Sequence, residues 1–241
     1  MKLLENLEGG DFCYNFAMDR IFLYSHGFAM HADDGGIFTD IEALFPDDKH
    51  VLFEYDNWID DGARAIAATL SERTEILHAK YAELREQNPD AEIDLICHSQ
   101  GCGIAALAQL EGITTTIFLA PPINYGDGES AHSHALAKKA CEQQEDGSIV
   151  YKRSAGFETI YPPYYWDDWS VAANMPDLIN QLAKKTELII VDATNDTVIA
   201  DRKDYSALDH DLRIEHLATN HEMQGEDGTR TAMKVLLKTL F

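Results

Sequence analysis

The sequence of 241 residues has few basic side chains: 19 lysines and arginines stand against 42 aspartates and glutamates, which gives a formal net charge of −23. This charge repels phosphate backbones and anionic membrane surfaces over about a Debye length. We therefore expect neither nucleic acid nor a membrane as a partner. A saline habitat and simple solubility both account for such a balance, and the sequence does not separate them.

Cysteines and long apolar runs are also scarce. The four cysteines, Cys13, Cys97, Cys102 and Cys141, form no CxxC pair, which favours reduced, buried thiols over disulfides or zinc ligands. No run of about 18 apolar residues predicts a membrane span. The opening "MKLLENLEGGDFCYNF" has acidic residues and a Gly pair where a secretory signal needs an apolar core, so we expect a cytoplasmic location.

Hydrophobic residues make up 45% of the chain, enough for one large core, and we expect a single domain over residues 1–241. Short β-rich runs recur along it, several of them apolar throughout, as strands covered on both faces require. These predicted strands are residues 20–25, 50–55, 91–97, 114–120, 186–193 and 212–218.

Helical patterns alternate with these strands. A long helix is predicted to begin near Asp60 and to end before Pro89, and further helices are predicted at 100–110 and 228–241. The apolar stripe of the long helix consists of Ile66, Leu70, Leu77, Tyr81 and Leu84. The β, α, β, α, β order predicts an α/β fold with a doubly wound, mostly parallel sheet.

One segment breaks the alternation. From residue 121 to about 176, prolines, glycines and aromatic residues replace regular strands and helices. We interpret residues 123–176 as a short inserted lid. Within it, residues 147–161 are predicted to form a hairpin that turns at Ala155 and Gly156.

The stretch "LICHSQGCGIAAL" (95–107) places Ser99 between a predicted strand and a predicted helix, with Gly101 two positions later. In a nucleophile elbow the serine lies on a strained turn, and small residues are needed two positions before and after it. Cys97 stands at the first of these positions, where glycine is usual. The motif alone leaves an ordinary strand-to-helix turn open as an alternative.

A His-Gly pair lies in "YSHGF" (24–28), at the end of the first predicted strand. Such a pair turns the chain so that the next backbone N–H, that of Phe28, points at a developing oxyanion. The N–H of Gln100 at the elbow is the expected second donor. His26 is then a structural, hydrogen-bonding histidine, and simple capping of a strand is the alternative.

A serine hydroxyl needs a base, usually a histidine held by a carboxylate. Asp196 lies in the loop after strand 186–193, at the sheet edge where ligands gather in α/β folds. Asp192 is its rival, ranked second because it lies within the apolar run.

The base is expected after the last strand. His221 follows strand 212–218 in "LATNHEMQGE", whereas His216 belongs to that strand and His210 precedes it. The resulting order of Ser99, Asp196 and His221 is the order of triads on the α/β-hydrolase fold.

With these residues, the chain resembles the α/β-hydrolase superfamily over residues 20–241. Within it, "HSQG" (98–101), "FLAPP" (118–122) and the hairpin-bearing insertion are similar to feruloyl (cinnamoyl) esterases and to serine-aminopeptidase-like hydrolases. The chain departs from these groups in two places. Few residues precede "RIFLYS", and "EYDNWIDDG" stands where they usually carry an Asp-x-x-Gly-x-Gly-x-Ser segment.

The resemblance implies a two-step acyl transfer. Ser99 attacks a carbonyl carbon, the N–H groups of Phe28 and Gln100 hold the oxyanion, and His221 protonates the leaving group before water repeats the sequence. No metal or organic cofactor is implied. The leading hypothesis is a serine esterase for small or medium neutral carboxylic esters. An amidase, an aminopeptidase, a thioesterase and a non-catalytic ligand-binding homologue are the alternatives, and the oligomeric state is not indicated.

Aromatic residues cluster in the insertion between Tyr161 and Trp169. In a lid they would line an apolar acyl pocket, although for most of them we favour packing within the lid itself. Our candidates for contact with the substrate are His26, Tyr164, Trp166 and Trp169. The pair Asp167 and Asp168 would meet a substrate amine or, as we favour, form a solvated acidic turn.

Overall fold

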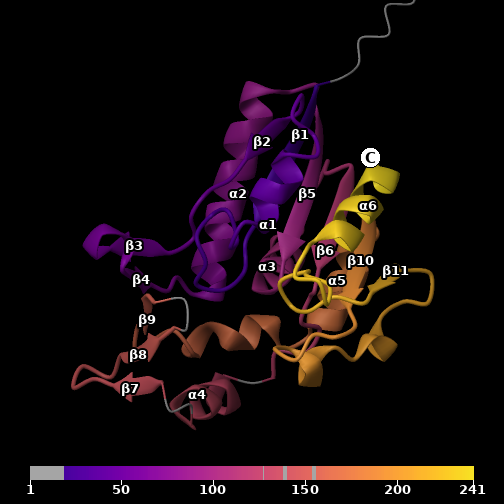
Figure 1. Cartoon of the computed structure of the whole chain (residues 1–241). Helices are drawn as coiled ribbons and strands as arrows, with labels where there is room; N and C mark the ends of the chain where they lie inside the picture. The colour runs from indigo at the N-terminus through magenta and orange to yellow at the C-terminus, as the bar shows by residue number, and fades with distance from the viewer. Residues whose placement is uncertain (1–18, 127, 138–139, 154–155) are drawn as a thin grey trace, which may run out of the picture.

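The structure is a computed structural model that describes residues 19–126, 128–137, 140–153 and 156–241 (Figure 1). The expectations for the opening sixteen residues, for Cys13 and for Ala155 fall outside this described part. Cys97 and Cys102 are buried in the core.

A six-stranded sheet forms the centre of the molecule, and every pairing between its strands is parallel. Ile21 lies opposite Ile93, and Ile189 lies opposite Ile117, so apolar runs face each other across the sheet. In the order of the sheet the strands are β11 (Arg213–Leu217), β10 (Glu187–Ala193), β6 (Thr115–Leu119), β5 (Glu92–His98), β1 (Arg20–Ser25) and β2 (Lys49–Val51). This confirms the predicted parallel sheet, but the expected strand 50–55 is wrong beyond Val51.

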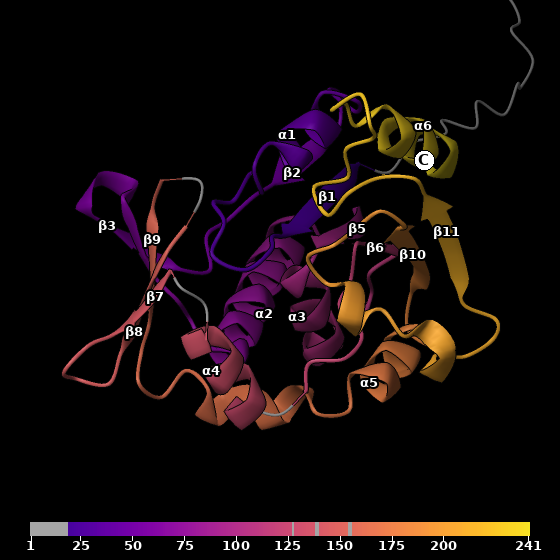
Figure 2. The same cartoon turned by 60° about the horizontal axis from the view of Figure 1, so that its bottom comes forward.

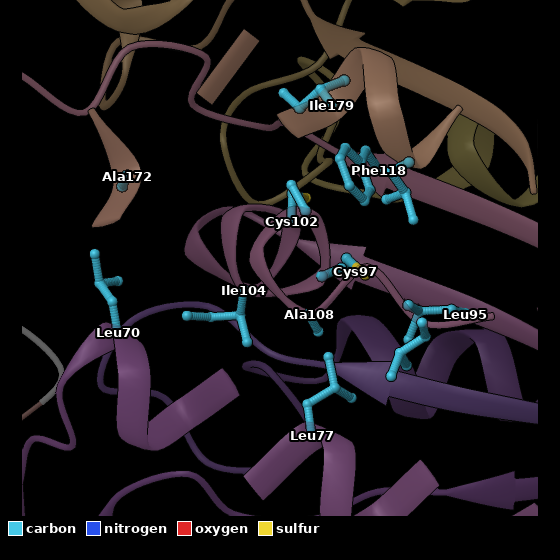
Figure 3. Packing of buried hydrophobic residues seen from close by; sticks show 14 of the residues in the cluster. Leu70, Leu77, Leu95, Cys97, Cys102, Ile104, Ala108, Phe118, Ala172 and Ile179 are labelled. Carbon is cyan, nitrogen blue, oxygen red and sulfur yellow. The ribbon is translucent and has the colours of Figure 1, made fainter. Parts of the chain in front are cut away.

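Helices cover both faces of this sheet (Figures 1 and 2). Alternate residues of β1 point to opposite faces, so Leu23 joins the core cluster under one group of helices and Phe22 the cluster under the other. The first group is α2 (Leu70–Gln87), α3 (Gln100–Ala108) and α5 (Met175–Leu182); the second is α1 (Ile37–Glu42) and α6 (Thr231–Leu240). Figure 3 shows part of the first cluster, to which α2 contributes Leu77 and α3 contributes Ile104. None of the helices in the described ranges combines the length and apolar character needed to cross a membrane.

The long helix α2 begins at Leu70, so the predicted start near Asp60 is wrong. The cause is local: the side chain of Thr69 accepts the N–H of Glu72, and the Glu72 carboxylate accepts the N–H of Thr69. This capping box fixes the first turn of the helix. Ile66, which we assigned to the helical stripe, lies in a strand instead.

A second, smaller sheet lies beside the first and has the order β3-β4-β9-β8-β7. We call it the small sheet. Its strands are β3 (Asn57–Ile59), β4 (Arg64–Ile66), β7 (Cys141–Gln143), β8 (Ile149–Lys152) and β9 (Glu158–Tyr161). The antiparallel pairing of β8 with β9 confirms the predicted hairpin.

The small sheet joins two distant parts of the chain, because β4 pairs in parallel with β9 of the inserted segment. The short 3₁₀ helix η1 (Asp60–Gly62) connects β3 to β4, and three positive φ angles, at Asp60, Asp61 and Gly62, make this turn. The insertion also contains α4 (Gly128–Ala137), before β7, and the 3₁₀ helix η2 (Asp167–Ala172), after β9. Residues 123–176 therefore share their sheet with a segment that the sequence assigned to a helix.

Candidate active site

Ser99 lies on the sharp turn between β5 and α3, with a φ of 51° and a ψ of −124°. A positive φ is strained for a residue with a side chain, and it is the geometry of a nucleophile elbow. Gly101 is needed because a Cβ atom there would lie 2.1 Å from the carbonyl oxygen of Ser25. Cys97, two positions before the serine, is fully buried in the core, so its small side chain fits this turn.

The structure brings the three predicted residues Ser99, His221 and Asp196 together. His221 Nε2 lies 3.0 Å from Ser99 Oγ, and His221 Nδ1 lies 2.6 Å from Asp196 Oδ2. Asp196 and His221 lie in the loops that follow β10 and β11, at the carboxyl end of the sheet, where β5 also ends.

Asp196 is held as a carboxylate. Its Oδ1 accepts the N–H groups of Val198, at 2.7 Å, and Ile199, at 3.2 Å. Burial alone would raise the pKa of Asp196, but the hydrogen bond and charge of His221 and these two N–H groups outweigh it and lower the pKa.

The rival carboxylate, Asp192, has different partners. Its Oδ1 accepts from Lys203 Nζ at 3.1 Å and from Tyr205 Oη at 3.2 Å. Its Oδ2 lies 3.0 Å from His216 Nδ1. Asp192 thus ties β10 to the chain that follows it and to β11, and it makes no hydrogen bond with His221.

The two expected oxyanion donors both lie beside Ser99 on the wall of one cavity. Phe28 belongs to the loop after β1, and Gln100 is the first residue of α3, whose first N–H groups have no partner within the helix. Neither backbone N–H has an acceptor among the residues that the structure describes. They are therefore available to a ligand.

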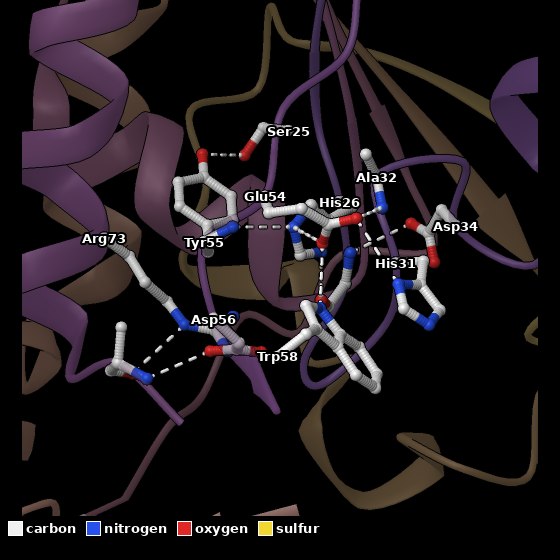
Figure 4. A network of polar contacts seen from close by, with 12 residues as sticks. Ser25, His26, His31, Ala32, Asp34, Glu54, Tyr55, Asp56, Trp58 and Arg73 are labelled. Atoms are coloured by element: carbon white, nitrogen blue, oxygen red, sulfur yellow. Dashed lines mark hydrogen bonds and ion pairs between the residues drawn. The ribbon is translucent and has the colours of Figure 1, made fainter. Parts of the chain in front are cut away.

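A fully buried ion pair supports both of these residues (Figure 4). Arg73 Nη2 of α2 lies 2.6 and 2.8 Å from the two carboxylate oxygens of Asp56. Its Nη1 donates to Gln100 Oε1 at 2.9 Å, and the guanidinium carbon lies 5.1 Å from the centre of the Phe28 ring. Sequence reasoning missed Arg73 because a charged residue inside a helix ordinarily faces solvent.

His26 is buried and is not part of the cavity wall. Its ring lies between the carbonyl oxygen of Gly27, at 2.8 Å from Nδ1, and the N–H of Tyr55, which donates to Nε2 at 3.2 Å. Burial and the nearby Arg73 charge lower the pKa of His26, so the ring is neutral. These contacts agree with the structural role that we expected for His26. Because His26 does not line the cavity, it is not placed to contact a substrate there.

A second acid–histidine pair, absent from the predictions, links the loops of the site. His98 lies 2.8 Å through Nδ1 from Asp34 Oδ2, which also accepts the N–H of Gly27 at 2.9 Å. Through Nε2, at 2.9 Å, His98 donates to the backbone oxygen of His221. The pair therefore connects the loop of Phe28, the elbow and the loop of the base. The His before Ser99 is a visible signal in the sequence, but nothing there indicates Asp34 as its partner.

His98 is protonated in this arrangement. Burial lowers its pKa, but the Asp34 charge and hydrogen bond, with the His221 carbonyl, outweigh burial and raise the pKa to about 9. The ordinary value is 6.5, so between pH 6.5 and 9 the folded protein holds a proton that the unfolded chain has lost. The stabilisation of up to about 3 kcal/mol is thus complete below pH 6.5 and disappears as the pH rises to 9.

Urea unfolding at about pH 6 and about pH 9.5 measures this loss. In His98→Gln the amide nitrogen replaces Nε2 as the donor to His221 but does not titrate. We expect the free energy of unfolding to fall further with pH in the native protein than in His98→Gln. Equal falls in both proteins would contradict a protonated His98.

The cavity has a volume of about 680 Å³, and Ser99 and His221 lie on its wall. The inserted segment contributes Tyr161, Tyr165, Trp166 and Trp169 to the same wall. These rings also pack on one another, as in the stacked pair of Tyr161 and Trp166 with centroids 5.2 Å apart. Of the predicted substrate contacts, Trp166 and Trp169 thus lie on the cavity wall, whereas Tyr164 is 54% exposed and does not line the cavity.

The two acidic residues of "WDDW", Asp167 and Asp168, lie in different environments from each other. Asp168 accepts both the N–H and the hydroxyl of Ser71, each at 2.6 Å, at the start of α2. Asp167 is exposed, and neither carboxylate lines the cavity. In the described part of the chain, no group of three or more His, Cys, Asp or Glu side chains is arranged to hold a metal ion.

No family model matches the sequence, and no curated protein matches it. Solved structures do match, at low sequence identity. The α/β hydrolase GrgF from Penicillium sp. sh18 has a TM-score of 0.64 and 14% identity, over 93% of this chain and 89% of that one. Tomato Methylketone Synthase I, complexed with 2-tridecanone, has a TM-score of 0.64 and 12% identity, over 92% and 98%.

A third similar structure is the esterase domain of a Rhodothermus marinus protein, with a TM-score of 0.60 and 16% identity over 92% of this chain and 87% of that one. At such identities the likeness concerns the fold. The chain has the α/β-hydrolase fold, which confirms the fold that the resemblance implied.

Proposed function

We propose that this protein is a serine hydrolase that cleaves small or medium carboxylic esters through an acyl-enzyme intermediate. The observation that carries the proposal is the chain of hydrogen bonds from Ser99 Oγ to His221 Nε2, at 3.0 Å, and from His221 Nδ1 to Asp196 Oδ2, at 2.6 Å. A serine on a strained turn, a histidine base and a buried carboxylate are the groups that acyl transfer needs.

The Asp196 carboxylate accepts from Nδ1 of His221, which leaves the lone pair of Nε2 facing Ser99. His221 takes the proton of the hydroxyl as Oγ attacks the ester carbonyl carbon. The N–H groups of Phe28 and Gln100 then hold the oxyanion, and each such donor typically lowers the barrier by about 2.7 to 4 kcal/mol. His221 returns the proton to the departing alcohol, and water releases the acid by the same steps.

The size of the cavity supports small or medium substrates. Its volume of about 680 Å³ lies within the range of roughly 300 to 1,000 Å³ that is usual for small-molecule sites. The aromatic wall suits an apolar acyl or alcohol group. The esterase domain among the similar structures agrees with ester cleavage.

Labelling with a fluorophosphonate tests this proposal. We expect the folded protein to be modified at Ser99, as found by mass spectrometry of its peptides, and to lose hydrolysis of p-nitrophenyl butyrate in parallel. Protein unfolded in urea is the control and remains unmodified. If Ser99 of the folded protein is not labelled, the serine hydrolase proposal fails. Labelling without turnover of any ester, amide or thioester would favour a ligand-binding homologue instead.

A further inference from the structure

Two arginines on the cavity wall differ from most other arginines of the chain in the carboxylate partners of their side chains. Five of the eight arginines lie within 4.0 Å of a carboxylate oxygen: Arg20, Arg64, Arg73, Arg213 and Arg230. A sixth, Arg85, donates to three backbone carbonyl oxygens. The other two, Arg153 and Arg202, have no carboxylate partner among the described residues, and both line the cavity.

This pairing pattern is unexpected in so acidic a chain. Carboxylates outnumber lysines and arginines by 42 to 19, so most cations find an acidic neighbour. Arg153 and Arg202 are both half-buried, and removing a guanidinium from water without a counter-charge is unfavourable. The missing counter-charge at this wall points to an anionic group on the ligand.

Arg153 is the more firmly held of the two. Its guanidinium carbon lies 5.8 Å from the ring centre of Phe28 and 5.7 Å from that of Phe157. Its Nη2 donates to the backbone oxygen of Phe28 at 3.3 Å and contacts Met30 Sδ at 3.8 Å. The donors on Nη1 and Nε make no hydrogen bond to a described residue, and Nη1 belongs to the outer end of the guanidinium, one of the edges that bind carboxylates.

The position of Arg153 connects it with the proposed chemistry. Phe28, which it contacts through ring and carbonyl oxygen, is the residue whose N–H is an expected oxyanion donor. A group bound by Arg153 therefore lies close to the reacting carbonyl.

Arg202 adds a second positive charge to the same cavity wall. It ends the 3₁₀ helix η3 (Ala200–Arg202), and its backbone oxygen accepts the N–H groups of Ile123, at 2.7 Å, and Asn124, at 3.2 Å. The backbone is thus fixed, while its guanidinium makes no hydrogen bond to any described residue.

Among the described residues, none of the acidic side chains on the wall forms an ion pair with either arginine. Asp34 is paired with protonated His98, and the Glu222 charge acts on the same histidine. Asp201 is exposed to solvent and forms no ion pair within the described ranges.

We propose that the preferred substrates are esters that carry a carboxylate, which the guanidinium of Arg153 binds while Arg202 contributes a second positive charge. This rests on the proposed serine hydrolase function and replaces the neutral ester expected from the sequence. The carboxylate belongs either to the acyl part or to the alcohol part of the ester, and the binding chemistry is the same for both.

Two matched pairs of esters separate these sources. Monoethyl adipate against diethyl adipate tests a carboxylate on the acyl side, and 3-carboxyphenyl butyrate against its methyl ester tests one on the alcohol side. Proton release in a pH-stat gives kcat/KM for each. In at least one pair we expect the carboxylate form to be preferred on the order of ten-fold, the usual effect of a charge-assisted hydrogen bond. The preference should shrink in about 0.5 M salt.

Arg153→Met should remove most of this preference, and Arg202→Met should reduce it less. Arg64→Met is the matched control: Arg64 lies in β4 of the small sheet, whose strand β8 ends one residue before Arg153, but it pairs with Asp60 and Glu158 and does not line the cavity. It should leave the preference unchanged. Thermal unfolding and fluorophosphonate labelling of Ser99 verify that each variant is folded.

Preference for the uncharged ester in both pairs would overturn the inference, and so would an unchanged preference in folded Arg153→Met. In either case, labelling of Ser99 and turnover of the uncharged esters would leave the proposed function intact. Absence of both labelling and turnover would overturn the proposed function and this inference together.

Discussion

Ser99→Ala is expected to lower kcat for p-nitrophenyl butyrate by about 10⁶-fold, the usual consequence of removing a serine nucleophile from an intact triad. The reason is chemical: His221 Nε2 lies 3.0 Å from Ser99 Oγ, and without this oxygen no acyl-enzyme forms. The N–H groups of Phe28 and Gln100 remain, so a residual rate of about 10³- to 10⁴-fold over water is expected. Release of p-nitrophenol measures both rates.

Ser170→Ala is the matched control, because Ser170 is an exposed serine of η2 outside the cavity wall. We expect it to retain native activity. Thermal unfolding of Ser99→Ala should remain close to native, since alanine accepts the same backbone turn about as well as serine does. If folded Ser99→Ala kept its activity, another nucleophile would have to carry the reaction.

The sequence was sufficient to predict the sheet and the meeting of Ser99, Asp196 and His221. Apolar runs such as residues 186–193 mark strands buried on both faces. Parallel strands end at the same edge of a sheet, so residues that follow different strands come together there. The hydrogen bonds from Ser99 to His221 and from His221 to Asp196 show that the three side chains meet at this edge, as the rule implies.

The small sheet lay beyond sequence reasoning for a physical reason. Residues 64–66 pair with residues 158–160, and no local pattern encodes a pairing across such a separation. The spacing of Ile66 from Leu70 fits a helix as well as it fits the end of a strand. The stronger local signal was the capping box of Thr69 and Glu72, which marks the true start of α2.

The buried charges were equally hidden. Arg73 and Asp34 are fully buried, although their residue types are usually exposed. Each is stable there because a partner from another element, Asp56 or His98, completes an ion pair. Tertiary contacts determine which charged residues pair in this way, and the sequence alone does not indicate these pairs.

Asp196→Asn should lower kcat by about 10⁴-fold. The amide oxygen of asparagine would keep the N–H groups of Val198 and Ile199, which now bind Oδ1. The amide nitrogen would then replace Oδ2, which lies 2.6 Å from His221 Nδ1. Because this nitrogen donates, Nδ1 must accept and the ring proton moves to Nε2. His221 would then present N–H to Ser99 and could not take its proton.

Asp192→Asn makes the corresponding change in the rival carboxylate. Asp192 binds Lys203, Tyr205 and His216 rather than His221. Losing its charge should therefore reduce the free energy of unfolding by about 1 kcal/mol while kcat stays within a few-fold of native. Steady-state kinetics and urea unfolding of both variants separate the two roles. A larger loss of kcat in Asp192→Asn than in Asp196→Asn would refute the assignment. The larger loss must come from replacing the carboxylate that holds the His221 ring in its active tautomer.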